Sequence, residues 1–268
     1  MGHWFDYSPH RHFVMPAAER CEVWRLVLGV LLTVVAVAAL GQVYGSFVFG
    51  LLEGLGLLMD GETLGQGNTP ITVLILLSGY GTVAIAVFGV LWILHERTIR
   101  SVFGPGRAMR TQFVMVLLGL VVLNLMIEVL PPWNYNEPLV RNLDCGPWLR
   151  VVPFALMAIL IQTGAEEVLF RGYIQQQLGA RFNSPLIWML MPSLLFGALH
   201  YDPDATGANA WYGMIWAVLF GMAAADLTAR SGTLGPAIAL HFANNVMALM
   251  FVALPDGLPG LALFTTPF

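Results

Sequence analysis

The feature that most constrains this chain is a series of long apolar stretches with few or no charges. Seven occur, near residues 26–50, 70–94, 111–130, 151–170, 185–201, 209–227 and 233–254. A helix needs about 20 apolar residues to cross about 30 Å of hydrocarbon. The stretches are too long and too uniformly apolar for the alternating strands of a membrane barrel. They predict an all-α, polytopic bundle of transmembrane helices with seven spans, and the apolar tail at 255–268 leaves room for a short eighth.

Composition agrees with a membrane protein. Hydrophobic residues make up 57% of the 268 residues and charged residues 10%, whereas soluble domains are about one-quarter charged. The net charge of −4 gives no indication of nucleic-acid binding. We expect a segment at 1–25 on the cytoplasmic side and a single transmembrane domain at 26–268.

Arginine placement predicts the orientation. All twelve basic residues are arginines, and ten of them fall in alternate loops on one side of the predicted bundle: Arg11, Arg20, Arg25, Arg97, Arg100, Arg107, Arg110, Arg171, Arg181 and Arg230. Short loops rich in arginine stay in the cytoplasm, so we expect a cytoplasmic N-terminus. The absence of lysine suggests a GC-rich coding bias and a prokaryotic inner membrane.

Three polar clusters lie in the second half of the chain, within about 150–250. Charges inside a membrane segment are costly and suggest function. Glu166 and Glu167 follow a long uncharged run, and Arg171 stands four residues after Glu167 on the same helical face. His200 ends the sequence FGALH, which begins at Phe196. The third cluster consists of His241 and Asn245.

His241 and Asn245 stand four residues apart in an apolar run, so both project from one helical face. Each of the three clusters could also be purely structural. Glu and His often lie at the interfacial ends of helices, and His and Asn often form hydrogen bonds between membrane helices.

A depth argument brings the clusters together. The sequence RFNSP at 181–185 is the strongest turn signal in the region. Glu166 and His200 each lie 17 residues from Asn183. An antiparallel hairpin about this turn therefore sets both side chains at the same height. The first helix of that hairpin must then continue through Gln175, Gln176 and Gln177, whose amides need a polar vestibule or protein contacts.

The three clusters together resemble a known family. EEVLFR at 166–171 is similar to an EExxxR motif, FGALH at 196–200 to FxxxH, and HFANN at 241–245 to HxxxN. In this order, on three apolar segments, they resemble the CAAX protease and bacteriocin-processing family of intramembrane endopeptidases, which includes the CAAX prenyl proteases. The resemblance covers roughly residues 150–250.

The resemblance implies a role for each matching residue. Glu166 would be the general base that takes a proton from the attacking water, and His200 would help to hold that water. His241 and Asn245 would form the oxyanion hole. Glu167 and Arg171 would support the site as a pair, and Phe196 would support it as well. The implied partners are the lipid bilayer and a membrane-associated protein or peptide substrate, and no metal or other cofactor is expected.

Two alternatives remain open. A zinc protease could use one glutamate and two histidines as ligands, although the chain has no HExxH sequence. A transporter, or a non-catalytic scaffold, could also carry Glu and His at mid-membrane, although no pair of interrupted helices appears in matching halves of the chain.

Overall fold

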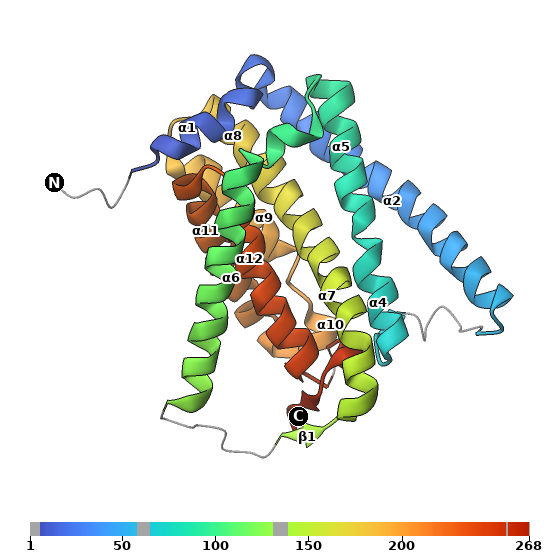
Figure 1. The fold of residues 1–268 in the computed structure, drawn as a ribbon. Coiled ribbons are helices and arrows are strands. Elements are labelled where there is room, and N and C mark those ends of the chain that lie inside the picture. The colour runs from blue at the N-terminus through green and yellow to red at the C-terminus, as the bar shows by residue number, and fades with distance from the viewer. Residues whose placement is uncertain (1–5, 58–64, 131–138, 256, 268) are drawn as a thin grey trace.

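The computed structural model describes residues 6–57, 65–130, 139–255 and 257–267 and is a bundle of helices (Figure 1). The α-helices are α1 (Ser8–Val14), α2 (Val23–Gly54), α4 (Pro70–Gly79), α5 (Gly81–His95), α6 (Gly106–Val129), α7 (Cys145–Glu167), α8 (Gln176–Arg181), α9 (Met191–Ala198), α10 (Pro203–Thr206), α11 (Ala210–Ser231) and α12 (Gly235–Val246). The π-helical segments are η4 (Val168–Gln175), η5 (Leu186–Leu190) and η7 (Met247–Phe251). The 3-10 turns are η2 (Met15–Arg20), η3 (Ile99–Val102), η6 (Gly207–Asn209) and η8 (Pro259–Leu261).

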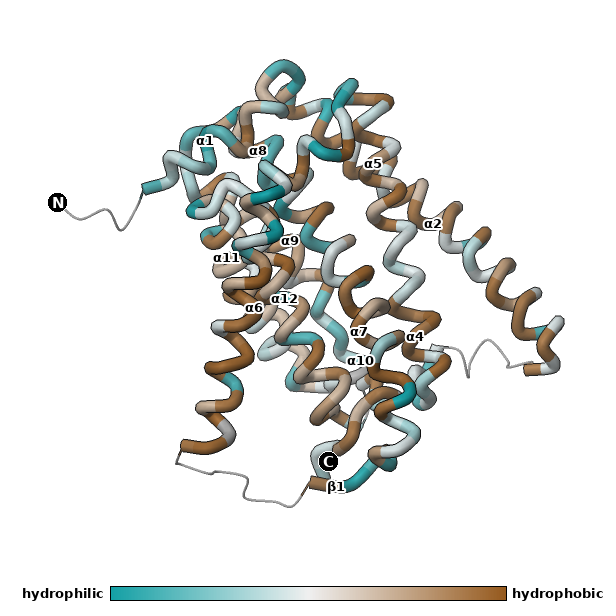
Figure 2. Tube along the Cα trace, viewed as in Figure 1, coloured by the Kyte–Doolittle hydropathy of each residue, from teal (hydrophilic) through white to brown (hydrophobic). Residues whose placement is uncertain are grey.

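Five of the described helices are long and apolar enough to cross a membrane: Val23–Gly54, Pro70–His95, Gly106–Ile127, Cys145–Arg181 and Gly207–Ser231. Two shorter apolar helices follow the same pattern, at Leu186–Ala198 and Gly235–Phe251. Together they coincide with the seven predicted stretches. The prediction of an all-α polytopic membrane protein is confirmed, and Figure 2 shows the hydrophobic residues spread along the length of the bundle.

The apolar tail does not add a helical span within the residues described. It forms the 3-10 turn η8 and the short strand β3 (Phe264–Thr265), which pairs antiparallel with β1 (Val140–Arg141) and parallel with β2 (Val252–Ala253). The indole Nε1 of Trp148 donates to the carbonyl oxygens of Met250 and Leu261, at 3.2 and 3.1 Å. The tail therefore closes the end of the bundle at which α7 begins.

The expected hairpin is present. α7, η4 and α8 form one continuous helix from Cys145 to Arg181, and the chain then turns into η5 and α9. The rings of Phe170 on η4 and Phe196 on α9 meet edge to face with centroids 5.1 Å apart. This contact fixes the two arms of the hairpin at the height that the polar clusters require.

Gln175, Gln176 and Gln177 are buried against other parts of the protein. All three are at most 1% exposed. Gln175 donates to the carbonyl of Ala225, and Gln176 donates to the carbonyls of Phe13 and Ser101. Of the two environments that the sequence allows for these amides, a polar vestibule or protein contacts, the structure has protein contacts, made by α1, α11 and the loop after α5.

Candidate active site

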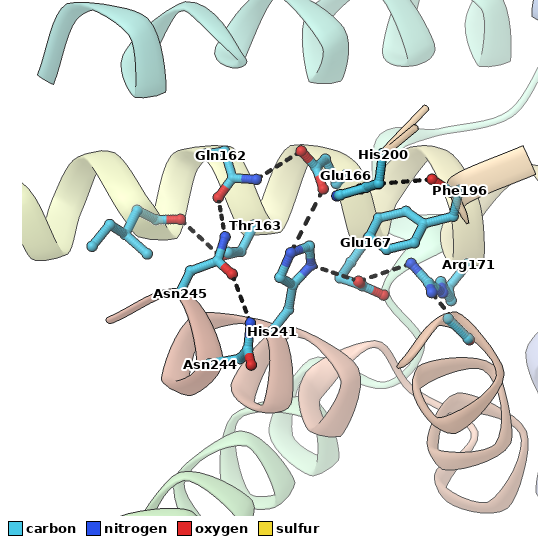
Figure 3. Close-up of polar contacts among 12 residues, drawn as sticks. Gln162, Thr163, Glu166, Glu167, Arg171, Phe196, His200, His241, Asn244 and Asn245 are labelled. Atoms are coloured by element: carbon cyan, nitrogen blue, oxygen red, sulfur yellow. Dashed lines mark hydrogen bonds and ion pairs between the residues drawn. The ribbon is translucent and has the colours of Figure 1, made fainter. Parts of the chain in front are cut away.

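The site begins on the last turns of α7. Gln162 and Glu166 stand four residues apart and share one helical face. The Nε2 atom of Gln162 donates to Oε1 of Glu166 at 2.7 Å, and both residues are buried. Glu167 points to the next face of the helix (Figure 3). The amide thus holds one oxygen of Glu166 and leaves the other, Oε2, directed elsewhere.

His241 of α12 lies between the two glutamates. Its Nδ1 is 2.9 Å from Oε1 of Glu167, and its Nε2 is 3.6 Å from Oε2 of Glu166 (Figure 3). An ionised carboxylate can only accept a hydrogen bond, so Nδ1 donates to Glu167. Nε2 is then the free end of the imidazole and faces Glu166.

Asn245, one turn further along α12, closes a second link to α7. Its Nδ2 donates to Oε1 of Gln162 at 2.8 Å, and its Oδ1 accepts from Nδ2 of Asn244 at 3.1 Å. Gln162 therefore joins Asn245 to Glu166 through the two ends of one amide. Two polar links, from His241 to the glutamates and from Asn245 to Gln162, fix the position of α12 along α7.

Arg171 holds the far side of Glu167. Its Nη1 donates to Oε1 of Glu167 at 2.9 Å, and its Nη2 donates to the carbonyl of Gly221 at 3.1 Å. The two side chains of this ion pair are at most 1% exposed. A charge this deeply buried is costly unless it is paired. The pair therefore neutralises Glu167 and leaves Glu166 as the carboxylate without an arginine partner among the described residues.

His200 reaches the network through Phe196. Its Nδ1 donates to the carbonyl of Phe196 at 2.8 Å, and its ring lies 4.4 Å from the Phe196 ring. The Phe196 ring also meets the His241 ring edge to face at 5.8 Å and lies under the guanidinium of Arg171 at 4.9 Å. With Nδ1 bonded to its own helix, His200 has Nε2 free for another partner.

Two oxygens in this network accept no hydrogen bond from the described residues, Oε2 of Glu166 and Oε2 of Glu167. A buried polar atom without a partner is unusual and costly. The Glu166 oxygen faces the free Nε2 of His241 across 3.6 Å. A water that bonds both atoms would have to lie to one side of the line that joins them, because two hydrogen bonds of about 2.8 Å together exceed this separation.

An apolar cavity of about 640 Å³ runs along α12 beside the network. Phe242, Ala243 and Val246 of α12 line one wall, and Leu156 of α7 and Asn124 of α6 line others. Phe242 and Ala243 point about 100° or more away from His241 around α12, and no residue of the polar network lines this cavity.

The donor set can be compared with that of a zinc site. Catalytic zinc takes three protein ligands in tetrahedral geometry. Across the described parts of the chain, no three His, Cys, Asp or Glu side chains are grouped closely enough to hold a metal. The Nδ1 atom of His241 is bonded to the Glu167 carboxylate, as in many metal-bound histidines. His241 is therefore oriented as a zinc ligand would be, but the described residues do not provide the other ligands close to it.

Sequence reasoning missed Gln162 and the contact of Glu167 with His241. A signal for Gln162 was present, since it is a polar residue in an apolar run, one turn before Glu166. The contact of Glu167 with His241 depends on how α12 packs on α7, which no spacing within one helix reveals.

The comparisons with known proteins agree with the three motifs. Residues 147–247 match a family model described as type II CAAX prenyl endopeptidase Rce1-like. The protein described as uncharacterized protein YyaK, from Bacillus subtilis (strain 168), is 27% identical over 176 residues, which make up 62% of this chain and 58% of the relative. No solved structure matches the chain. The matched segment contains all three clusters, and the resemblance to the CAAX prenyl endopeptidase family is confirmed over residues 147–247.

Proposed function

We propose that this chain is an intramembrane endopeptidase that hydrolyses a peptide bond of a membrane-associated protein or peptide with water activated by Glu166. The observation that carries the proposal is the oriented pair of Glu166 and His241. Gln162 fixes Oε1 of the carboxylate, Oε2 has no bonded partner among the described residues, and His241 Nε2 faces it at 3.6 Å.

In the proposed reaction, water held between Oε2 of Glu166 and Nε2 of His241 attacks the scissile carbonyl carbon. Glu166 takes the proton from the water as the new C–O bond forms. The same proton then passes to the amide nitrogen as the C–N bond breaks, which yields a carboxylic acid and an amine. A positioned general base typically contributes about 10²–10⁴ in rate. His200, with Nε2 free and its ring against Phe196, would hold the water from the other side.

Side chains of α12 would stabilise the oxyanion. Asn245 has one amide hydrogen committed to Gln162 and a second that can bond the oxyanion. His241 donates from Nδ1 to Glu167, so donation from Nε2 requires the doubly protonated ring. Glu167 and Arg171 would act by orienting His241, because their own contacts keep them on the far side of its ring.

The substrate class rests on the surroundings of the site. The helix that carries His241 and Asn245 is also bordered by a cavity lined almost entirely by apolar side chains, which suits a peptide that arrives from the membrane. The family description names a prenyl endopeptidase, and a lipid-modified C-terminal peptide is one substrate of this class. A prokaryotic inner membrane with the N-terminus in the cytoplasm is the location we propose.

Purified protein tests the proposal by cleavage of a membrane-peptide library, with products identified by mass spectrometry. Glu166→Gln should abolish turnover, because the amide keeps the shape of the carboxylate and cannot accept the proton. Glu53→Gln is the matched control, since Glu53 is an exposed glutamate on α2, and should leave the rate unchanged.

Chelation separates this proposal from the zinc alternative. Activity should survive prolonged treatment with a strong chelator, and the active protein should contain no stoichiometric metal. Loss of activity on chelation with recovery on adding zinc would overturn glutamate catalysis. A Glu166→Gln protein that still cleaves would show that Glu166 is not the general base, whereas no cleavage by the native chain would favour the transporter or scaffold alternatives.

A further inference from the structure

The arginine-rich end of α6 is a second polar feature, well separated in sequence from the proposed active site. The stretch between Glu96 and Glu128 contains four arginines and no acidic residue. Within the described chain, Arg100 and Arg107 form no ion pair, and Arg110 bonds only the carbonyl of Gly106. By contrast, Arg20, Arg25, Arg141, Arg171 and Arg230 each pair with a carboxylate.

Two of these arginines line a cavity. A cavity of about 570 Å³ is bordered by Arg100, Phe103, Gly104, Gly106, Met109 and Arg110. A neighbouring cavity of about 550 Å³ shares Arg100 and Gly104 and is bordered on its other side by His12 of α1. The cavity between Arg100 and Arg110 thus concentrates positive charge that no carboxylate of the described residues offsets.

The loop that forms the cavity floor is fixed in place. Gly104 has a φ of +75°, and a Cβ there would lie 2.5 Å from the carbonyl oxygen of Gly232. The backbone N–H of Leu234 donates to the carbonyl of Phe103 at 3.2 Å. The cavity is therefore preformed, and α6 begins beside it with no acidic residue in its first turn and no side-chain cap. The helix dipole adds to the positive potential of the arginines there.

An apolar face leads away from the cavity along α6. Val114, Leu118 and Val122 follow Arg110 at four-residue spacing and are 51%, 60% and 56% exposed. From Arg110 to Val122 the helix rises about 18 Å, which is close to half of a hydrocarbon core of about 30 Å. A ligand with a negative head and an apolar tail of that length would contact both the arginines and this face.

We propose that this end of α6 binds an anionic phospholipid, with the phosphate between Arg100 and Arg110 and an acyl chain along Val114, Leu118 and Val122. Basic pockets between transmembrane helices suit such head groups, and a guanidinium can bond two phosphate oxygens at once. A free phosphate would use only the arginines, whereas the lipid also covers the exposed apolar face.

Native mass spectrometry of the full chain in detergent tests the proposal, with phosphatidylglycerol and phosphatidylcholine of identical acyl chains as the probes. Phosphatidylglycerol should bind more tightly. In R100Q/R110Q its binding should weaken roughly 25- to 30-fold, since each arginine contributes a factor of about five. R150Q/R181Q removes the same charge away from the cavity and should bind as the native chain does. Single R100Q and R110Q proteins, each expected to lose part of the affinity, serve if the double variant does not fold.

Three results would overturn the proposal. The first is equal affinity for the two lipids, and the second is an equal loss in R100Q/R110Q and R150Q/R181Q. The third is full displacement of phosphatidylglycerol by millimolar inorganic phosphate, which would indicate a free-anion site in place of a lipid site.

Discussion

At the scale of single residues, Glu166, His241 and His200 each have one polar atom held by a hydrogen bond and one polar atom free. Gln162 holds Oε1 of Glu166, Glu167 holds Nδ1 of His241, and the carbonyl of Phe196 holds Nδ1 of His200. The free atoms are Oε2 of Glu166 and Nε2 of each imidazole. Held atoms fix the rotamers, so the free atoms are positioned before a substrate arrives.

Gln162 gives the sharpest test of this arrangement. Gln162→Leu removes the donor to Glu166 and the acceptor for Asn245 at similar volume. A hydrogen bond to a charged group is worth about 1.5–3 kcal/mol, so kcat should fall roughly 10- to 100-fold with KM nearly unchanged. Gln162→Glu keeps the acceptor for Asn245 and should be no better, because it sets a second carboxylate beside Glu166.

The control for Gln162 is Gln112→Leu. Gln112 also makes two hydrogen bonds to a neighbouring segment, through Ser231 and Thr233, at a distance in sequence from the site. The Gln112→Leu protein should have a lower thermal midpoint without a selective loss of kcat. A Gln162→Leu protein with normal kcat would show that the Gln162 amide does not position Glu166.

At the scale of elements, the sequence predicts the helices and the hairpin well, because charge-free length and the turn at 181–185 are local signals. The placement of α12 is different, since its contacts with α7 pair residues more than seventy positions apart, such as His241 with Glu167. The π-helical segments η4, η5 and η7 have no signature in the apolar pattern either. η4 follows Glu167 directly and contains Arg171, so a local widening of the helix accompanies the site, as π-helical turns often do.

Gly197 tests the crossing that sets His200 in place. A Cβ at Gly197 of α9 would lie 2.3 Å from Cγ2 of Val218 and 2.9 Å from the carbonyl of Met214, both on α11. Gly197→Val should push α9 from α11, cost about 1–3 kcal/mol through overpacking, and lower activity by displacing Phe196 and His200. Gly119→Val is the control, since nothing lies within 4 Å of that position. Equal thermal midpoints for the two variants in detergent would contradict the close crossing.

The docking of α1 gives a prediction in pH. Burial lowers the pKa of His10 to about 4, and its ring lies against that of Trp188, tilted by 32° with centroids 4.1 Å apart. With an unfolded pKa of about 6.5, the unfolded state binds the extra proton between pH 6.5 and 4, so stability rises with pH across that window and is lost as pH falls. At pH 5 the loss is about 2 kcal/mol, from 1.36 kcal/mol per pH unit.

Thermal midpoints at pH 7.5 and pH 5 measure this effect. The drop on acidification should be smaller in His10→Gln than in the native chain. His12→Gln should keep the full drop, because His12 is exposed on the same helix. An identical drop in all three proteins would assign the acid sensitivity to other groups.

At the scale of the whole molecule, the arginine-rich loops meet at one end of the bundle. Arg20 pairs with Glu96, Arg97 bonds Gln176, and Gln112 bonds the carbonyl of Ser231. These contacts join the segment before α2, the loop after α5, helix α8 and the end of α11. In Figure 2 this end is the hydrophilic one around α1 and α8. The opposite end carries β1 and the start of α7 (Figure 1).

The two cysteines of the chain test the orientation without any added reporter. Cys21 lies at the arginine-rich end, between η2 and α2, and Cys145 lies at the other end, where α7 begins and where its side chain is exposed. The positive-inside rule predicts that the arginine-rich end lies in the cytoplasm. In intact cells a membrane-impermeant thiol reagent should therefore label Cys145 in the Cys21→Ser protein. It should label Cys21 in the Cys145→Ser protein only after the membrane is opened. Labelling of Cys21 in intact cells would invert the orientation, and with it the side from which Arg100 and Arg110 meet the head groups.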